Sequence, residues 1–239
     1  MDSKRSTTTS PIVTARVAGL LYLLLLPLGI FGTLYVPSTL IVPGDAATTA
    51  ANILAHEPLF RMGIVSALLV QVVNILVVLL LYRLLKPVHK DWAALMVIFL
   101  LAGVPIAMFN ELNNAAVLLV VSGAPYQQGF STDQLQALIP LFLDLHKAGI
   151  NIAGIFWGLW LLPMGYLVFE SGFLPRILGI LLIIGCLGYL IDSFAFLLVP
   201  GLNIAIAQFT FLGEVLLPLW LLIKGVNEKK WEQRALESS

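Results

Sequence analysis

Residues 62–82 read MGIVSALLVQVVNILVVLLLY, a run of 21 residues without a charge. A helix needs about 20 mostly apolar residues to cross a bilayer, because each residue adds about 1.5 Å against a hydrocarbon core about 30 Å thick. A helix that is apolar on every side has no face suited to water. This run therefore predicts a membrane-spanning helix.

Five other stretches have the same character. The predicted spans, in chain order, are residues 17–36, 62–82, 92–121, 148–169, 177–199 and 202–223. The third span would be about 45 Å long if unbroken, so we expect it to tilt, to protrude or to kink at Pro105. The sequence thus predicts an all-α polytopic membrane bundle with six transmembrane helices.

The composition of the whole chain agrees with this fold class. Of its 239 residues, 59% are hydrophobic and 11% are charged, whereas an ordinary soluble domain is about 25% charged. A secreted disulfide scaffold is excluded, because Cys186 has no second cysteine to pair with. No nucleic acid is expected as a partner, since 13 basic residues are balanced by 13 acidic ones and no basic face dominates. The expected partner is the lipid bilayer.

Basic residues predict the orientation. Eleven of the 13 lysines and arginines flank span ends that we expect on one side of the membrane, and only Arg61 and Lys147 lie on the other. Basic loops tend to stay in the cytoplasm, so both termini are predicted to be cytoplasmic. Residues 1–15 then form a cytoplasmic tail, 16–226 the six-helix membrane domain, and 227–239 a second cytoplasmic tail that we expect to be a solvated helix.

Two connections on the predicted outer side are long. Residues 37–57 contain a turn and a short helix that we expect Asp45 to cap. Residues 122–132 are rich in turn formers, and an amphipathic pattern begins at Asp133. That pattern predicts a helix that lies on the outer surface or runs into the fourth span. The two segments either cap an outward cavity or merely connect helices.

Three acidic residues lie inside predicted spans: Glu111, Asp192 and Glu214. A charge at the centre of a membrane helix is unfavourable by about 2.5–3.5 kcal/mol on insertion scales. Such residues persist when they are paired, protonated, bound to a metal or turned toward a wet cavity. Counting residues from the span ends places Glu111 and Asp192 in the outer half and Glu214 near the midplane.

Other polar side chains are expected at similar depths. Asn114 follows Glu111 by three residues, so the two should be adjacent. Residues 144, 147 and 151 should form one stripe, with His146 about 100° away from it. We predict a polar, outward-facing pocket between helices two to six. Its predicted residues are Arg61, Glu111, Asn114, Asp144, His146, Lys147, Asn151, Asp192 and Glu214.

The same acids also have a purely structural interpretation. Glu111 and Asp192 would pair with Arg61 or Lys147 to fix helix packing. Glu214 would be a protonated acid bonded to an amide side chain of the second span. A glycine repeat over residues 149–158 is typical of close helix packing.

A metal site would draw on His146 and Asp192. The chain has no His-Glu-x-x-His motif and no cysteine cluster, and Asp144 and His146 should point to nearly opposite helix faces. It has no Gly-x-Ser-x-Gly elbow and no nucleotide fingerprint either. We therefore predict no metal and no cofactor.

Several short blocks resemble a known family. They are ARVAGLLY at 15–22, IVPGDA at 41–46, LDLH at 143–146, GINI at 149–152, SGFLPRILG at 171–179, GYLIDS at 188–193 and GE at 213–214. Together these blocks resemble domain-of-unknown-function family 4386 over roughly residues 12–226. The resemblance implies a prokaryotic plasma-membrane protein and supplies no activity. Glu111 lies outside the matching blocks.

Three functional hypotheses remain. The first is a non-enzymatic protein whose pocket binds or moves a small solute, a proton or a lipid headgroup, with Arg61 and Lys147 tuning the acids by charge proximity. The second is an intramembrane hydrolase or transferase, in which His146 and an acid hold a metal or act as acid and base. The third is a structural partner subunit whose acids lock its helices. We favour the first, and no particular solute or protein partner is indicated.

Overall fold

The computed structural model describes residues 10–238 except 124, 200 and 203, and every regular element in this part of the chain is a helix. The long helices are α1 (Pro11–Gly29), α4 (Glu57–Leu85), α5 (Lys90–Val121), α6 (Thr132–Glu170) and α7 (Arg176–Leu198). The shorter ones are the π-helix η1 (Ile30–Tyr35), α2 (Val36–Leu40), α3 (Ala46–Ala55), the 3₁₀ turn η2 (Pro125–Gly129), α8 (Ala207–Thr210), α9 (Leu212–Ile223) and α10 (Glu228–Glu237).

Among the described residues, five helices are long and apolar enough to cross a membrane. They are α4, α5, α6, α7 and the run Pro11–Leu40, in which α1, η1 and α2 follow one another without a gap. These helices contain the first four predicted spans and all of the fifth except its last residue, Val199. The prediction of an all-α bundle is confirmed, and the length and apolar composition of these helices support a membrane protein.

The prediction of one helix over 202–223 is wrong. Residues 204–206 are not helical, α8 has 4 residues, and α9 has 12 residues, which is too short to cross a bilayer alone. A sixth span is counted only if α8–α9 and α10, which meet at 103°, are taken as one broken span. The chain reverses near Gly201, which has a positive φ of 81° of the kind that glycine adopts without strain.

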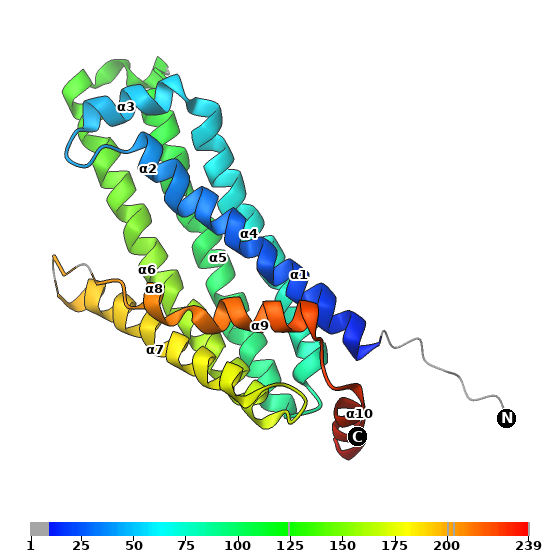
Figure 1. Cartoon of the computed structure of the whole chain (residues 1–239). Coiled ribbons are helices and arrows are strands. Elements are labelled where there is room, and N and C mark those ends of the chain that lie inside the picture. The colour runs from blue at the N-terminus through cyan, green and yellow to red at the C-terminus, as the bar shows by residue number, and fades with distance from the viewer. Residues whose placement is uncertain (1–9, 124, 200, 203, 239) are drawn as a thin grey trace.

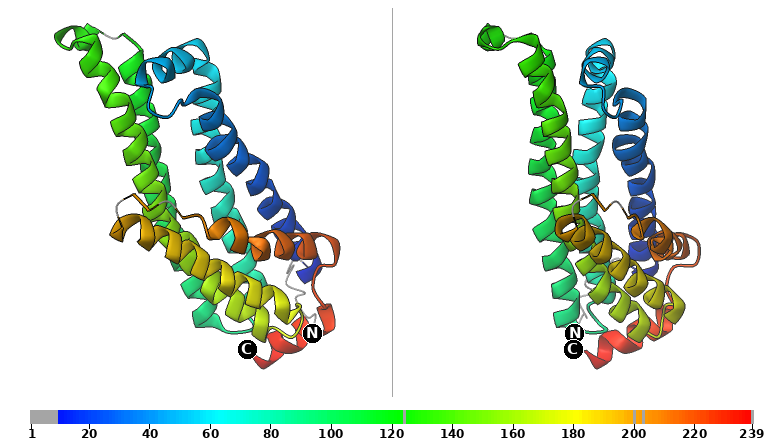
Figure 2. Two further views of the ribbon diagram at one scale, coloured as in Figure 1. Left: turned by 60° about the vertical axis from the view of Figure 1, so that its left-hand side comes forward. Right: turned by 90° about the vertical axis from the view of Figure 1, so that its left-hand side faces the viewer.

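The bundle has two distinct ends, which we name the α3 end and the α10 end after the short helices found there (Figure 1). α5 lies beside α6, and α1 lies beside α4, while α7 and α9 cover only the half nearer the α10 end (Figure 2). Nine described lysines and arginines lie toward the α10 end; Lys4 and Arg5 are outside the described residues. The side of the membrane that this end occupies stays a prediction.

Both ends of the described chain meet at the α10 end, where Ser10 Oγ donates to Glu228 Oε1 at 3.1 Å. The helix expected in the C-terminal tail is present as α10, and it is docked on the bundle. Trp231 Nε1 donates to the Leu84 carbonyl at 2.8 Å, and Arg234 Nη2 donates to the Glu170 carbonyl at 3.0 Å. α10 therefore links the end of α4 to the end of α6.

The predicted helix cap at Asp45 is confirmed, and the structure adds a second cap at Ser131 that was not predicted. Asp45 Oδ1 accepts from the Thr48 N–H at 2.8 Å and begins α3. Ser131 and Gln134 form a reciprocal capping box at the start of α6. Because α6 then continues unbroken to Glu170, the amphipathic segment that begins at Asp133 runs into the fourth span and does not form a separate surface helix.

The apolar core is divided into two clusters. The larger one fills the half nearer the α10 end and includes Tyr22, Leu100 and Trp160. The smaller one joins α2, α3, α4, α5 and α6 at the α3 end and includes Val36 and Phe60. The cavities described next are lined by residues of these two clusters.

Candidate functional site

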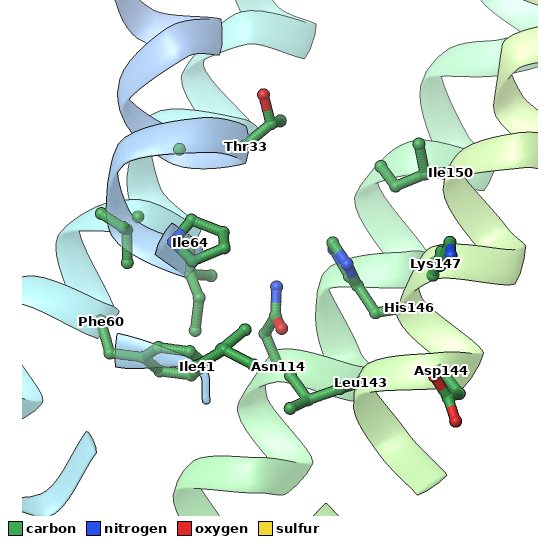
Figure 3. Close-up of a pocket in the computed structure, with 14 residues that line it drawn as sticks. Thr33, Ile41, Phe60, Ile64, Asn114, Leu143, Asp144, His146, Lys147 and Ile150 are labelled. Carbon is green, nitrogen blue, oxygen red and sulfur yellow. The ribbon is translucent and has the colours of Figure 1, made fainter. Parts of the chain in front are cut away.

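A cleft of about 420 Å³, here called the α3-end cleft, separates two unlike walls. One wall comes from η1, α2, the residue after it and α4, and Thr33 is its only residue with a polar side chain. The other wall comes from α5 and α6 and carries Asn114, Asp144, His146 and Lys147 beside Leu143 and Ile150 (Figure 3). One wall of the cleft is therefore apolar, and the other, here called the polar wall, holds nearly all of its polar side chains.

Behind the polar wall, the buried Glu111 of α5 pairs with the partly buried His146 of α6. His146 Nε2 lies 3.0 Å from Glu111 Oε1, and Asn114 Nδ2 donates to Glu111 Oε2 at 2.9 Å. Asn110 Nδ2 donates to the His146 carbonyl at 2.8 Å. Glu111 is only 6% exposed, and both its carboxyl oxygens have a hydrogen-bond partner, as is usual for buried polar atoms.

This arrangement confirms one predicted contact and replaces another. Glu111 and Asn114 meet as their spacing predicted. Arg61 does not serve as the partner of Glu111, since its Nε pairs with Glu57 Oε1 of the preceding turn at 2.6 Å. His146 takes that place, because α5 and α6 pack closely along their length.

Close packing of α5 on α6 depends on Gly149. A Cβ at this position would lie 2.0 Å from Asn110 Oδ1, which is far inside any contact distance. Gly154 and Gly158 have the same role against α7, where a Cβ would meet Ser193 Oγ and Tyr189 Cβ at 2.9 Å each. The predicted role of the glycine repeat in close packing is confirmed.

The remaining predicted residues on α6 lie near the rim of the cleft. Figure 3 shows His146 and Asp144 on different sides of α6, in agreement with their predicted directions. Lys147 also lines the cleft, and its Nζ lies 5.7 Å from the centre of the Phe196 ring. Asn151 donates from Nδ2 to the Lys147 carbonyl one turn back, at 2.9 Å, and is not among the residues that line the cleft.

Asp192 has a backbone role that the sequence did not reveal. Its two carboxylate oxygens accept the N–H groups of Ile206 and Ala207, each at 2.8 Å. A carboxylate at the first N–H groups of a helix satisfies donors that have no partner within the helix. Asp192, which belongs to α7, therefore caps the start of α8 and does not share a site with His146.

Glu214 lies in a second hollow, here called the central cavity, of about 270 Å³. Tyr22 OH donates to Glu214 Oε2 at 3.2 Å, and the Tyr189 hydroxyl also contacts the carboxylate. An amide of the second span was expected as the partner of Glu214; Asn74 does line this cavity, but the hydrogen-bond donor is Tyr22. Thr33 lines both the central cavity and the α3-end cleft.

The nine predicted site residues thus separate into groups. Asn114, Asp144, His146 and Lys147 line the α3-end cleft, and Glu111 bonds two of them from behind. Glu214 lies in the central cavity, and Arg61, Asn151 and Asp192 make local contacts. Within the described part of the chain, no three His, Cys, Asp or Glu side chains come close enough to hold a metal ion.

Sequence reasoning missed the aromatic residues around Glu214, namely Tyr22, Trp157, Trp160 and Tyr189. In an apolar span an aromatic residue looks like ordinary core. A signal was nevertheless present, because Tyr22 and Tyr189 lie in the blocks ARVAGLLY and GYLIDS, and Glu214 lies in a third block.

Comparisons with known proteins show the family of this chain. An uncharacterized protein of Archaeoglobus fulgidus is similar, with 31% identity over 163 residues that cover 68% of this chain and 83% of the relative. No solved structure matches the chain. The model of the family described as Domain of unknown function (DUF4386) matches residues 17–225, which include α4 to α9 and most of α1. The chain therefore belongs to the DUF4386 family.

Proposed function

We propose that the protein binds an amphipathic small molecule in the α3-end cleft. The observation that carries this proposal is the unlike character of the two walls. A ligand that is polar throughout would leave the wall of η1, α2 and α4 without matching groups, and a pure hydrocarbon would leave His146 and Asn114 unsolvated. A molecule with a polar head and an apolar part matches both walls.

The polar wall is built to hold a headgroup in a fixed place. Glu111 and Asn110 hold the ring and the backbone of His146, so the imidazole has little freedom to lose when a ligand binds. Asp144 and Lys147 add charges of both signs at the same wall. A headgroup that carries both a donor and an acceptor, such as that of a zwitterionic lipid, fits this pattern.

The apolar wall offers contacts for the rest of the ligand. Val36 and Phe60 line this wall and are well packed, since they are only 2% and 4% exposed, and Ile64 of α4 also lines it. A neighbouring hollow of about 390 Å³ shares Ile41, Leu143 and Asp144 with the cleft and continues under the segment that leads into α3. The long connections of the α3 end therefore border the proposed binding space.

The distribution of basic residues supports placing the α3 end outside the cell. Nine described lysines and arginines lie toward the α10 end, and Arg61 and Lys147 lie toward the α3 end. With basic loops in the cytoplasm, both termini are cytoplasmic and the cleft faces the outer half of the plasma membrane. We propose a prokaryotic cell as the setting, on the strength of the archaeal relative.

The proposal can be tested by filling the α3-end cleft with a larger side chain. Ile64→Trp would fill the cleft from its apolar wall, whereas Leu69→Trp adds the same side chain at a position on α4 that is 46% exposed. Native mass spectrometry of detergent-purified protein would count bound lysophosphatidylethanolamine. We expect one saturable adduct for wild type and Leu69→Trp and a loss of at least about tenfold for Ile64→Trp. Equal binding by all three proteins would refute the proposal.

The buried Glu111–His146 pair supports a second candidate function, acid–base catalysis on a ligand in the same cleft. A carboxylate that holds an imidazole fixes the tautomer and orientation needed for proton transfer. The same experiment separates the two: free fatty acid released from the lysolipid by wild type, and not by His146→Ala, would show an enzyme. Stable binding without release would show a binding protein.

A further inference from the structure

We propose that the central cavity is a binding site for a small organic ammonium ion. The cavity lies in the middle of the bundle, and residues of α1, η1, α4, α5, α6, α7 and α9 line it. This second binding site does not depend on the function proposed for the α3-end cleft, because a different set of side chains forms the central cavity. Only Thr33 is common to the two.

The carboxylate of Glu214 is incompletely bonded. Glu214 Oε2 accepts from Tyr22 at 3.2 Å. The Tyr189 hydroxyl is close to the carboxylate, but Glu214 Oε1 is buried and no described residue makes a hydrogen bond to it. A buried carboxylate oxygen without a donor is unfavourable by about 1–3 kcal/mol, and a ligand N–H would satisfy it.

Five of the described residues that line the central cavity are aromatic. Tyr22 and Trp160 pack with ring centres 5.7 Å apart, and Trp157 and Tyr189 contribute further surface. Aromatic faces attract organic cations, above all where water is excluded. Such a surround, with Glu214 as the one acid of the described lining, favours an organic cation.

Glu214 is the one acidic side chain among the described residues that line the cavity. The described residues that line the central cavity include no lysine, arginine or histidine, so the cavity has an acid and no internal cation to balance it. The Trp157 indole N–H is also buried, and no acceptor among the described residues reaches it. A ligand with an ammonium group and a nearby oxygen would satisfy Glu214 Oε1 and Trp157 Nε1 together. A volume of about 270 Å³ limits the ligand to a small molecule.

Ethanolammonium chloride is a suitable probe, and ethylene glycol is its neutral counterpart of almost the same shape. Both are too polar to partition into detergent micelles. Binding to purified full-length protein would be followed by tryptophan fluorescence, since Trp157 and Trp160 line the cavity, with sodium chloride keeping the ionic strength constant. We expect saturable binding of ethanolammonium and none of ethylene glycol.

Variants assign that binding to the cavity. Glu214→Gln should weaken it by at least about tenfold, and Trp157→Phe, which removes the indole N–H and keeps a ring, should weaken it severalfold. Glu57→Gln, at an exposed acid that pairs with Arg61, should bind like wild type. If Glu214→Gln fails to fold, the comparison of the two probes and Trp157→Phe still decides. Absent binding, equal binding of ethylene glycol, or unchanged binding by a folded Glu214→Gln protein would overturn the proposal.

Discussion

His146 illustrates how one buried contact changes the role of a side chain. A histidine at the mouth of a membrane helix is commonly an interfacial hydrogen bonder. Here its ring is held 3.0 Å from a glutamate on a neighbouring helix, and its backbone carbonyl is held by Asn110. Because Glu111, Asn114 and His146 share one network, the effects of single substitutions among them should not add.

The first prediction concerns Glu111. Glu111→Leu leaves the amide of Asn114 and a nitrogen of His146 without a partner, so we expect a loss of about 1–3 kcal/mol in the free energy of unfolding. Glu111→Gln keeps an oxygen and should lose less. Reversible unfolding of detergent-solubilised protein, followed by circular dichroism, measures the difference; equal stability of the two variants would contradict the network.

The second prediction concerns Gly149. Gly149→Ala places a Cβ against Asn110 and displaces the bond from Asn110 to the His146 carbonyl, so we expect about 1–3 kcal/mol of destabilisation. Gly29→Ala is the matched control, because a Cβ there meets no neighbouring atom within 4 Å. The same unfolding measurement should find that control at or slightly above wild-type stability.

At the scale of elements, the break before α8 determines the shape of the last part of the bundle. A continuous helix over 202–223 would need no anchor, whereas an interrupted chain exposes N–H groups that must be bonded. Asp192 of α7 supplies both acceptors for the restart at Ile206 and Ala207. In the sequence Asp192 resembles a proton-binding residue or a metal ligand, but in the structure its carboxylate accepts hydrogen bonds from the backbone.

The third prediction tests this role. Asp192→Ala should raise deuterium uptake of peptides from the 204–211 segment, because two amides lose their acceptors, while uptake in α7 itself stays low. Asp133→Ala, which removes an exposed acid from the first turn of α6, is the control. Unchanged uptake at 204–211 in the Asp192 variant would show that other contacts hold the segment.

The fourth prediction concerns the cap of α3. Hydrogen bonds from Thr48 lower the pKa of Asp45 from its ordinary value of 3.8. The folded state thus binds this proton more weakly than the unfolded chain, so the carboxylate stabilises α3 above that value, and the stabilisation is lost as the pH falls through the lowered pKa.

Asp45→Asn keeps a good capping side chain that does not titrate. Hydrogen exchange in α3, corrected for the intrinsic effect of pH, should therefore rise in acid for wild type and stay level for the Asn variant. Asp45→Ala should exchange faster at every pH. Identical acid responses in wild type and Asp45→Asn would place the titration elsewhere.

For the molecule as a whole, features that depend on residues close together in the sequence were predictable, and features that depend on distant residues were not. Spans and caps depend on neighbours along the chain, so α3, the start of α6 and five apolar helices were predictable. The Glu111–Asn114 contact was predictable for the same reason. The choice of His146 over Arg61 depends on how α5 and α6 are rotated against each other, which a single sequence does not encode in readable form.

The central cavity was harder to predict, because it is assembled from seven elements distributed over the whole chain. The failure at 202–223 has a similar cause. Its apolar residues satisfy the length rule for a span, but Asp192 and the turn at Gly201 lie outside any window that scores hydrophobicity.

The fifth prediction concerns orientation in the membrane. The single cysteine, Cys186, is 2% exposed and should resist labelling. In intact cells, a membrane-impermeant maleimide should label Gln128→Cys at the α3 end and should leave Ser238→Cys at the α10 end unlabelled until the cells are lysed. Labelling with the opposite pattern would invert the predicted topology, and Cys186→Ser serves as the background for both variants.

The π-helical turn between α1 and α2 has a consequence for comparing sequences. The Val36 N–H bonds to the Phe31 carbonyl, five residues back, so this turn holds about one residue more than an α-helical turn. Removing one residue from 30–35 would rotate the following residues by about 100°. Val36 and Leu40, now 2% and 1% exposed, would then swing out of their core. A homologue whose first helix lacks this extra residue must therefore be aligned with a one-position gap here, or every residue from Val36 to the start of α3 will be matched to the wrong face.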